Sequence, residues 1–482
     1  MITLNELILS KSKTLSNLPI VDTTIVQENL QRALTKSNYK VIVLDDDPTG
    51  IQTVNGIYVF TDWSIESIRE GFDDPHSLFY ILTNSRGLTI DKTIAVHEQI
   101  ANRITEVAKE KRQNYLVISR SDSTLRGHYP IETEVLKQTL EANSDIRFDG
   151  EVIIPFFEEG GRYTLNNIHY VQEGDNLVPA GQTEFAQDKT FGYKSSHLGE
   201  WIEEKTASSY PMERIRYFSI EELRALDYRA LLNKLMTVHD FNKVVVNAAS
   251  YDDVRIFVTV LLQALEAGKH FIFRSAAAFP KILGNVSDKP LLTREELVNV
   301  SNKNGGFIII GSHVQKTTAQ LEKLLTVKDV VPLEFNQHLV LDQNAFRAEI
   351  ERIIRLANDY IANRQTVVVY TRRHRFDLNL GNKDEELQIS LRISSALTHI
   401  ASELQIRPNF MIAKGGITSS EVGVKALKVR KALVLGQILQ GVPVWLTGNE
   451  SKFPNLPYVI FPGNVGDENS LLEAYEKICP TL

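Results

Sequence analysis

The 482-residue chain contains a single cysteine, Cys479, near its C-terminus. One cysteine cannot form an intrachain disulfide, and its being alone excludes a zinc site built from several cysteines. The sequence also lacks any apolar run of about 20 residues, the length that a membrane-spanning helix needs. Its first residues show no basic segment followed by an apolar one, as a secretory signal would. These absences predict a cytoplasmic protein without a membrane partner.

An excess of positive charge is missing as well. The 60 Asp and Glu residues outnumber the 53 Lys and Arg residues, which gives a formal net charge of -7. This balance argues against broad binding to the phosphate backbone of nucleic acids. With 43% hydrophobic and 23% charged residues, the composition is typical of a globular protein. The length exceeds that of one ordinary core, so we expect two domains.

Short apolar runs alternate with amphipathic helical patterns along most of the chain, which predicts two α/β domains with largely parallel sheets and an active-site cleft between them. We expect a helical lead-in over residues 1–40, an N-terminal domain over 41–300 and a C-terminal domain over 301–482. The polar, Gly-containing segment Ser301–Gly306 marks the boundary. Between about 155 and 210 the alternation breaks, which is typical of an inserted lid or small subdomain.

The apolar runs define the expected elements. The strands of the N-terminal domain are predicted at 41–44, 77–82, 115–119, 151–154, 243–247 and 270–274. Those of the C-terminal domain are predicted at 307–310, 366–370, 409–413 and 458–461, with helices at 314–325, 345–363 and 384–405.

The first predicted strand ends in three consecutive acidic residues, Asp45, Asp46 and Asp47, followed by Pro48-Thr49-Gly50. Ligands of open α/β sheets gather beyond the carboxyl ends of the strands, so this turn is predicted to lie at an active-site edge. Adjacent carboxylates raise one another's pKa or attract a cation. A solvated turn in which Asp47 or Thr49 starts a helix is the structural alternative.

Two further segments, Thr83–Gly87 and Ser119–His128, follow predicted strands and combine Arg with hydroxyls and carboxylates. An Arg fork binds a carboxylate or phosphate through two hydrogen bonds, and Asp and Ser side chains bind sugar hydroxyls. The combination predicts a site for a small polyhydroxy acid. The alternative is an internal network of ion pairs in which Asp122 or Ser123 starts the next helix.

Three Gly-containing turns follow strands of the C-terminal domain, at Gly311–His313, Lys414–Ser420 and Pro462–Gly466. Glycine lets a phosphate approach main-chain N–H groups, so the three turns together predict a cradle for nucleotide phosphates. Each turn alone is explained equally well as a structural turn or helix cap. Neither a Walker A sequence nor a G-x-G-x-x-G after the first strand is present, which disfavours the P-loop and Rossmann interpretations.

The spacing Asp45-x-Asp47-x-Thr49 also fits the nucleophile motif of haloacid-dehalogenase-like phosphatases. In that mechanism Asp45 would form an aspartyl-phosphate, Asp47 would act as acid and base, and Asp252-Asp253 would hold Mg²⁺. This hypothesis gives the C-terminal domain no role. A third hypothesis is a non-catalytic sensor that binds an acid sugar without turnover.

Taken together, the motifs resemble the four-carbon acid sugar kinases, which phosphorylate threonate, erythronate or 3-oxo-tetronate. The resemblance extends from about residue 40 to about residue 475 and rests on Asp46–Gly50, Asn84–Arg86, Asp122–Gly127, Gly415–Thr418 and Gly463–Gly466. It implies an N-terminal acid-sugar-binding domain, a C-terminal ATP-binding domain, and transfer of the γ-phosphoryl group of Mg²⁺-bound ATP to a terminal hydroxyl of the acid.

The resemblance also assigns residues. It implies Asp47 as the catalytic base, with Asp46 as the second candidate. The substrate would lie among Arg86, Arg120, Asp122, Ser123 and Arg126. The ATP phosphates and ribose would lie against Ser312, Gly415, Gly416, Ile417, Thr418, Gly463 and Gly466. No residue is assigned as a metal ligand, and the oligomeric state stays open, a homodimer included.

Three departures from the family pattern concern the ligands. Where the family commonly has Ala-Asp-Asp, this chain has Asp45-Asp46-Asp47, and Arg120 stands where many members have Lys. Phe461-Pro462 precedes Gly463, where a Lys is frequent. The first two changes bear on which acid is accepted, and the third bears on how the phosphates are held.

Overall fold

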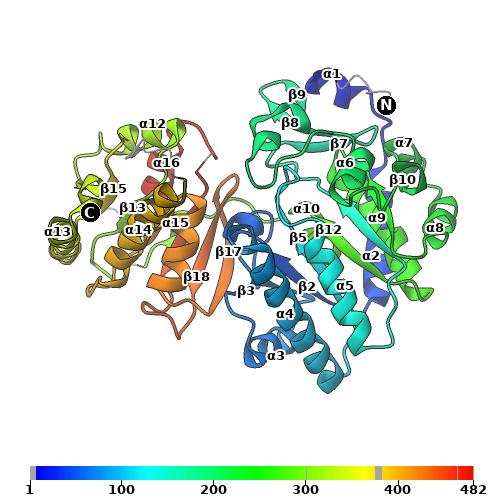
Figure 1. Ribbon diagram of the computed structural model, residues 1–482, viewed down its shortest axis with the longest axis horizontal. Helices are drawn as coiled ribbons and strands as arrows, with labels where there is room; N and C mark the ends of the chain where they lie inside the picture. Colours follow the sequence, from blue (N-terminus) through cyan, green and yellow to red (C-terminus); the bar gives the residue numbers. More distant parts are fainter. Residues whose placement is uncertain (1–6, 300, 375–382, 464, 481–482) are drawn as a thin grey trace. The chain divides into compact units, whose positions relative to one another are not determined.

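A computed structural model describes residues 7–299, 301–374, 383–463 and 465–480 of the chain. The chain forms two compact units (Figure 1). Unit 1 is the chain up to Thr53 together with Asp62–Ser287, and unit 2 is Val54–Thr61 together with the chain from Asp288. The sequence had placed the division near residue 300 and had not assigned the short segment Val54–Thr61 to the second unit.

The described part of unit 1 contains a sheet of seven parallel strands in the order β10-β11-β6-β12-β5-β2-β4. The strands are β2 (Lys40–Asp45), β4 (Leu78–Leu82), β5 (Tyr115–Arg120), β6 (Gly150–Ile154), β10 (Arg216–Phe218), β11 (Asn242–Val246) and β12 (Phe271–Ser275). The predicted strands are confirmed; β10, which is three residues long, was missed. Every residue of β2, β4, β6 and β12 is buried, as expected of a parallel sheet covered on both faces.

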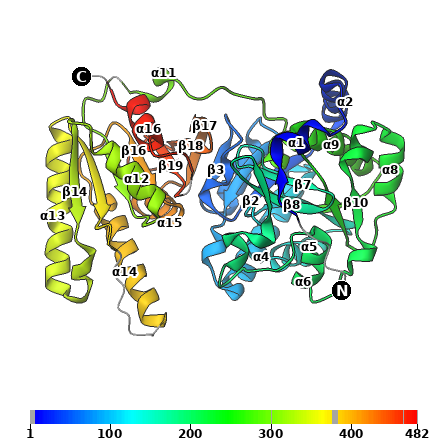
Figure 2. The same cartoon turned by 90° about the horizontal axis from the view of Figure 1, so that it is seen from above.

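Helices cover both faces of this sheet (Figures 1 and 2). One layer contains α3 (Ile65–Asp73), α4 (Ile90–Lys111) and α5 (Ile131–Asn143), and the other contains α2 (Thr23–Lys36), α8 (Tyr228–Met236) and α9 (Tyr251–Glu266). The helical lead-in expected before residue 40 is present as α1 (Lys11–Ser16) and α2. Because parallel strands need such crossovers, the carboxyl ends of all seven strands lie at one edge.

The segment between about 155 and 210 has an antiparallel sheet of its own, in the order β1-β9-β8-β7. Its strands are β1 (Leu9–Ser10), β7 (Arg162–Leu165), β8 (Ile168–Glu173) and β9 (Asn176–Pro179), and α6 (Leu198–Lys205) follows. Trp201 on α6 is fully buried and stacks on Tyr129, with ring centroids 4.5 Å apart. This packing fixes the insertion onto unit 1.

Unit 2 contains a mixed sheet in the order β3-β17-β18-β19-β16-β13-β15-β14. The strands from β19 to β14 are parallel, whereas β3, β17 and β18 pair antiparallel. Their bounds are β3 (Tyr58–Phe60), β13 (Phe307–Ile310), β14 (Val330–Phe335), β15 (Thr366–Thr371), β16 (Met411–Lys414), β17 (Lys431–Leu439), β18 (Val442–Thr447) and β19 (Pro457–Phe461). The four predicted strands and the α/β fold class are confirmed.

The strands that the sequence analysis missed in unit 2 have recognisable physical signatures. Pro332 interrupts β14, which is tolerated because β14 lies at the edge of the sheet. β17 and β18 form a hairpin whose two-residue turn ends in Gly441 with φ +77°. A two-residue Gly-containing turn between alternating apolar residues is a hairpin signal, and it could have predicted this pair.

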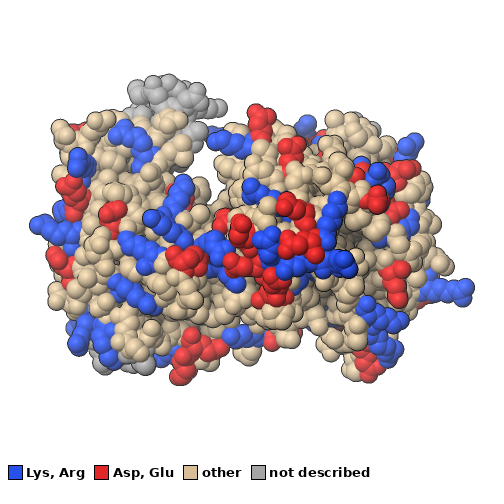
Figure 3. All heavy atoms as spheres, turned by 90° about the horizontal axis from the view of Figure 1, so that it is seen from below, with Lys and Arg blue, Asp and Glu red and all other residues tan. Residues whose placement is uncertain are grey.

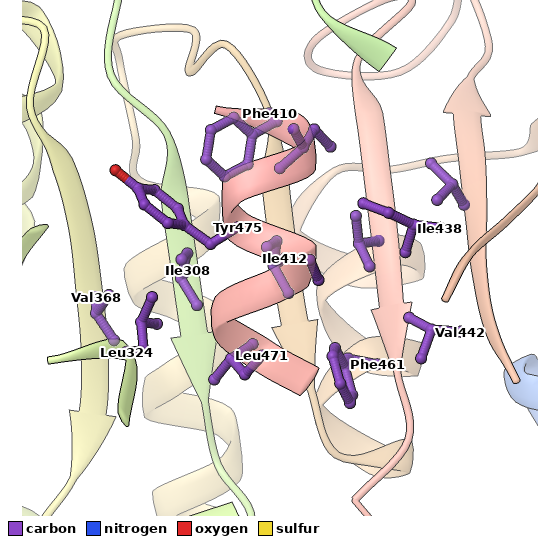
Figure 4. Close-up of a cluster of buried hydrophobic side chains, with 14 of the residues drawn as sticks. Ile308, Leu324, Val368, Phe410, Ile412, Ile438, Val442, Phe461, Leu471 and Tyr475 are labelled. Carbon is purple, nitrogen blue, oxygen red and sulfur yellow. The ribbon is translucent and has the colours of Figure 1, made fainter. Parts of the chain in front are cut away.

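The hydrophobic core of unit 2 fixes the strands that carry the glycine turns (Figure 4). Leu324 of α12 (Gln315–Leu324) and Leu471 and Tyr475 of α16 (Ser470–Ile478) pack over the sheet. They belong to one buried cluster with Ile308 of β13, Ile412 of β16 and Phe461 of β19. The other long helices of this unit, α13 (Gln343–Ala362) and α14 (Lys383–Ser402), match the predicted ranges within three residues. Among the described helices, none is long and apolar enough to cross a membrane.

Candidate functional site

The acidic turn after β2 is held between the ends of the two neighbouring strands. The main-chain N–H of Asp46 donates to the carbonyl of Arg120 at 3.2 Å, and the N–H of Thr83 donates to the carbonyl of Asp45 at 2.8 Å. Side chains that follow β2, β4 and β5 therefore meet at the carboxyl edge of the unit 1 sheet. This is the edge at which the sequence predicted a ligand site.

Arginine and aspartate side chains form a continuous network at this edge. Arg86 binds Asp46 through two hydrogen bonds, Nη2 to Oδ1 at 2.6 Å and Nε to Oδ2 at 3.1 Å. Its Nη1 lies 3.7 Å from Oδ2 of Asp47 and 3.7 Å from Oδ1 of Asp122. Arg126 Nε donates to Asp122 Oδ2 at 2.8 Å. The structure thus brings together residues from three turns that the sequence had singled out separately.

Arg120, the last residue of β5, also belongs to this network. Its Nη1 lies 3.2 Å from Oδ1 of Asp45 and 3.8 Å from Oδ1 of Asp46. The remaining predicted substrate residue, Ser123, is buried, and its carbonyl accepts a hydrogen bond from Nε2 of His169 at 2.7 Å. His169 lies on β8, so the inserted sheet directly supports the turn that carries Asp122 and Ser123.

The four carboxylates titrate differently because their surroundings differ. Burial raises the pKa of Asp45 to about 7, against the opposing effect of Arg120. Burial also raises the pKa of Asp46 despite its pairing with Arg86. Burial opposes ionisation of Asp47 too, but Arg86 and the hydrogen bonds from Thr49 outweigh it and lower its pKa. Arg86 and Arg126 likewise overcome burial and hold the pKa of Asp122 well below its usual range. Near neutral pH, Asp47 and Asp122 are therefore ionised.

Two glycines lie beside these carboxylates, one favoured by close approach and the other by its backbone conformation. A Cβ atom on Gly50 would overlap the carboxylate of Asp45. Gly127 has φ +114°, and a Cβ atom there would lie 3.4 Å from Oδ2 of Asp46. Gly50 therefore makes room for the carboxylate of Asp45, and Gly127 provides the left-handed backbone conformation of its turn.

A guanidinium that forms no ion pair with a described acidic side chain lies beside this network. Arg162 of β7 donates to the carbonyl of Gly160, and its Nε is buried without a hydrogen-bond partner. Its guanidinium lies 5.7 Å from the ring centroid of Phe185, and that of Arg126 lies 5.0 Å from the same centroid. Burial lowers the pKa of Arg162 while Asp122 raises it, so Arg162 shares the field of the acidic cluster.

Sequence reasoning missed two supporting side chains. Arg274 of β12 donates to the carbonyl of Arg126 at 3.0 Å, and its guanidinium lies 5.0 Å from the centroid of Tyr129. Glu132 is buried and accepts hydrogen bonds from Ser85 at 2.6 Å and from Ser121 at 3.4 Å. The charge at the end of the apolar strand Phe271–Ser275 was a signal that could have found Arg274.

The residues that a phosphatase would need for Mg²⁺ have other roles. Asp253 is fully buried, binds Arg224 through two hydrogen bonds of 2.7 and 2.9 Å, and caps α9. Asp252 binds Arg255 at 2.8 Å. Four strand spacings separate β11, which precedes this pair, from β2, so about 19 Å divides their ends. The hypothesis that Asp252 and Asp253 complete a metal site with Asp45 was therefore wrong.

In unit 2 the three glycine turns follow adjacent parallel strands, β19, β16 and β13. Gly415 has φ +115°, and a Cβ atom there would lie 3.3 Å from Cβ of Ser312 and 3.5 Å from Oγ1 of Thr418. A Cβ atom on Gly463 would lie 3.4 Å from Oγ of Ser312. Thr317 Oγ1 of α12 connects the first and third turns, since it lies 3.3 Å from Oγ of Ser312 and 3.1 Å from the carbonyl oxygen of Gly463. Four of the predicted nucleotide residues, Ser312, Gly415, Thr418 and Gly463, thus lie close together at one edge of the sheet.

The other three predicted nucleotide residues differ in position. Gly416 begins α15 (Gly416–Glu421), and Ile417 on its first turn is 73% exposed, an unusual state for a large apolar side chain. Gly466, with φ +80°, lies in the loop before α16, where a Cβ atom would overlap Ser470. Gln320 of α12 holds this loop by donating to the carbonyl of Val465 at 3.1 Å. Gly466 therefore shapes the loop rather than sharing the contacts around Ser312.

Two cations at this edge were absent from the predicted set. Arg373 follows β15 and donates to the carbonyl of Ser312 at 2.7 Å, while its Nη1 is buried without a hydrogen-bond partner. Lys414 ends β16, immediately before Gly415, and is fully buried. A charged residue at the end of the apolar run Met411–Ala413 was the signal for Lys414.

No group of three or more His, Cys, Asp or Glu side chains in the described part of the chain is arranged to hold a metal ion. The aspartates at the unit 1 edge are neutralised by Arg86, Arg120 and Arg126 instead. Acidic and basic side chains also alternate over the face drawn in Figure 3, which shows no broad patch of one sign.

Known family models match both segments of the chain described above, the one with the acidic edge and the one with the glycine turns. Residues 41–283 match the family model described as a sugar-binding N-terminal domain, and residues 307–471 match the one described as a nucleotide-binding C-terminal domain. The chain belongs to the four-carbon acid sugar kinase family. The family expected from the motifs is thus confirmed, and the acidic edge lies in its sugar-binding domain and the glycine turns in its nucleotide-binding domain.

Solved structures of similar fold extend over most of the chain. A Haemophilus influenzae protein, HI1011 of family DUF1537, is 17% identical with a TM-score of 0.61, covering 91% of this chain and 100% of its own. A provisionally named tRNA synthase from Salmonella typhimurium LT2 is 15% identical with a TM-score of 0.65, covering 91% of this chain and 99% of its own. At such identities the likeness establishes the fold of this family member. Comparison with curated proteins found no match.

Proposed function

We propose that this family member is an ATP-dependent kinase that phosphorylates a terminal hydroxyl of a four-carbon sugar acid such as threonate, erythronate or 3-oxo-tetronate. The observation that carries the proposal is the arginine and aspartate network around Arg86 in the sugar-binding domain. Such a network supplies cations for a carboxylate and acceptors for hydroxyls in one place. A nucleotide-binding domain in the same chain supplies the phosphoryl donor.

Asp47 is the proposed catalytic base. Its side chain is 21% exposed, whereas that of Asp46 is 2% exposed and is committed to Arg86. Thr49 donates to Oδ1 of Asp47 twice, from its main-chain N–H at 2.8 Å and its hydroxyl at 2.6 Å. These bonds fix the carboxylate and leave Oδ2 for a substrate hydroxyl. Because phosphoryl transfer depends mainly on positioning and charge neutralisation, one fixed carboxylate that accepts the hydroxyl proton is sufficient.

Arg162 and Arg126 are the proposed partners of the substrate carboxylate. The two guanidiniums lie against the same Phe185 ring, and Arg162 has no ion pair with a described acidic side chain. A buried guanidinium without an acidic partner is costly, and a bound carboxylate would supply the missing charge. This assignment leaves Arg86 and Arg120 to hold Asp46 and Asp45 in place.

The edge formed by Ser312, Gly415, Thr418 and Gly463 is the proposed cradle for the ATP phosphates, and exposed Ile417 is proposed to pack against the nucleoside. Glycines at such an edge let phosphate oxygens reach main-chain N–H groups. Mg²⁺ commonly binds to nucleotide phosphates and water with few protein ligands. It therefore enters the proposal as part of Mg-ATP, where it neutralises phosphate charge.

The competing phosphatase hypothesis requires Asp45 to attack a phosphate ester. Asp45 is 1% exposed and pairs with Arg120, so its carboxylate is poorly placed as a nucleophile. The kinase proposal predicts that Asp45→Asn retains ATP-dependent turnover. The phosphatase hypothesis predicts that the same change abolishes hydrolysis of a phosphorylated acid without nucleotide.

The test is ADP release from Mg-ATP with D- and L-threonate, D- and L-erythronate, 3-oxo-tetronate and glycerate. Turnover with one acid establishes the kinase and identifies its substrate. Calorimetry with the same compounds separates the remaining cases. Binding of an acid without turnover would support a sensor, and hydrolysis without nucleotide would replace the proposal by the phosphatase.

A further inference from the structure

Lys414 is a fully buried lysine at the nucleotide-binding edge. Its Nζ donates one hydrogen bond, to the carbonyl of Pro462 at 3.1 Å, and lies 3.9 Å from the ring centroid of Phe461. Among the residues that the structure describes, none offers a carboxylate within ion-pair distance of this ammonium. An ammonium has three N–H donors, so a single carbonyl and a ring face leave its hydrogen-bonding capacity largely unused.

The position of this side chain connects two of the glycine turns. Lys414 is the last residue of β16, and Gly415 follows it with φ +115°. Pro462, which accepts the hydrogen bond, directly precedes Gly463 of the third turn. Gly415 and Gly463 both lie close to Ser312, which belongs to the first turn. The ammonium therefore lies against the main chain that forms the cradle.

Burying a charged lysine without an anion is expensive, and other buried arginine and lysine side chains of this protein show how the cost is usually met. Lys243, equally buried, pairs with Glu151 at 2.6 Å, and Arg120 pairs with Asp45 at 3.2 Å. Lys414 differs, because the charged side chain whose field acts on it is another cation, Lys316 of α12. Burial together with Lys316 lowers the pKa of Lys414 to about 7.

We propose that Lys414 binds the phosphate chain of the nucleotide and takes up a proton when the phosphates arrive. This inference rests on the proposed function, because it requires that the nucleotide binds at the cradle. The phosphates supply the negative charge that no described side chain places next to this lysine. An anion next to Nζ favours the ammonium form, so a lysine that is only partly protonated in the free protein at neutral pH becomes fully charged in the complex.

The number of protons taken up when Mg-ATP binds tests the proposal, because a lysine with only a structural role would not change its protonation on binding. At pH 8 a group with a pKa near 7 is about 10% protonated, so binding is expected to take up close to one proton, whereas at pH 6 uptake is small. Calorimetric titration of the full-length protein with Mg-ATP, in two buffers of different ionisation enthalpy, measures this number. Equal uptake at pH 6 and pH 8 in the wild type would overturn the proposal without any variant.

Substitution isolates the contribution of the ammonium. Lys414→Met keeps most of the unbranched side chain, one atom shorter, and removes the charge, and it is expected to weaken Mg-ATP about tenfold to hundredfold, the usual loss for a charge-assisted hydrogen bond. Adenosine affinity should change by less than about twofold, since adenosine has no phosphate. Lys425→Met is the matched control, because Lys425 is exposed and pairs with Glu421 on the protein surface.

The outcomes separate this inference from the proposed function. If the wild type fails to bind Mg-ATP, the proposed function fails and the inference with it. If Mg-ATP binds but Lys414→Met retains its affinity and its proton uptake, only the inference is overturned. Equal losses for adenosine and Mg-ATP would also overturn it, because they would assign Lys414 to the structure of the cradle.

Discussion

Arg86 donates hydrogen bonds to both carboxylate oxygens of Asp46, from Nη2 to Oδ1 at 2.6 Å and from Nε to Oδ2 at 3.1 Å. Its third nitrogen, Nη1, lies 3.7 Å from Asp47 and 3.7 Å from Asp122. One guanidinium thus orients three carboxylates while being bound bidentately by one of them. Asp46 thus engages Arg86 with both oxygens, whereas Oδ2 of Asp47 is the oxygen that the proposed mechanism uses, and adjacent residues in the sequence could not reveal this difference.

Asp47→Asn is expected to reduce turnover about 10²- to 10⁴-fold, because an amide cannot accept the hydroxyl proton. Affinity for Mg-ATP, measured by calorimetry, should be unchanged. The matched control is Asp252→Asn, which alters a partly buried ion pair with Arg255 outside the acidic network and should keep turnover within about twofold of wild type. An Asp47→Asn enzyme with wild-type turnover would remove Asp47 as the base.

Arg162→Met should raise KM for the sugar acid about tenfold to hundredfold, since it removes a half-buried cation at the proposed carboxylate subsite. The effect should vanish for a neutral substrate analogue such as the corresponding lactone or polyol, compared by competition binding. Arg32→Met, at a surface ion pair with Glu28, is the control. Equal losses for charged and neutral ligands would contradict this role for Arg162.

Gly50→Ala is expected to destabilise the protein by about 1–3 kcal/mol, because its Cβ atom would displace the Asp45 carboxylate from Arg120. Gly87→Ala is the control, since a Cβ atom there meets no atom within 4 Å. Thermal unfolding of both variants measures the difference. A Gly50→Ala protein as stable as Gly87→Ala would mean that the acidic turn can rearrange freely.

Gly415→Ala should lower Mg-ATP affinity at least about tenfold, because a Cβ atom would enter the cradle 3.3 Å from Ser312. The control must share the cost of a positive φ. Gly268 has φ +91° with open space around it, so Gly268→Ala imposes backbone strain of about 1 kcal/mol and leaves the cradle intact. Calorimetry that finds equal ATP affinities in the two variants would argue against a phosphate site at Gly415.

Asp45 makes stability depend on pH. Its pKa is raised from 3.8 to about 7 in the folded protein, so the folded state holds a proton that the unfolded state has lost. This contribution is full below about pH 4 and is lost as pH rises to about 7, with a magnitude of a few kcal/mol. Asp45→Asn cannot titrate, so its stability relative to wild type should increase between pH 5 and pH 8. Parallel urea unfolding at the two pH values checks this, and a constant difference would refute it.

Much of unit 1 could be predicted because local patterns dominate there. The run Val41–Leu44 is apolar at every position, as a strand buried on both faces must be, and the structure extends it by one residue at each end. The polar turns after β2, β4 and β5 lie at one edge because right-handed crossovers bring parallel strand ends together. By contrast, β1 and β9 pair across more than 160 residues, and no local pattern encodes that contact.

The candidate site divides in the same way. Asp46, Arg86 and Asp122 were predicted from their positions after strands, whereas Arg274 was missed. Arg162 was expected only as part of the lid over residues 155–210 and not among the substrate-binding residues. Arg274 belongs to β12, which lies beside β5 although about 150 residues separate them in sequence. Arg162 is carried by the inserted sheet, whose strands are too short for their alternation to indicate pairing.

The sequence by itself determined most of the parallel strands, the order of the acidic, arginine and glycine turns, and hence the family. Only the tertiary structure decided which charges pair: Asp46 with Arg86, Asp45 with Arg120, and Lys414 with a carbonyl instead of an acid. Turn residues and apolar periodicity act over a few positions and are therefore written in the local sequence. Ion pairing and pKa depend on distance and burial, which exist only after strands far apart in the chain have come together.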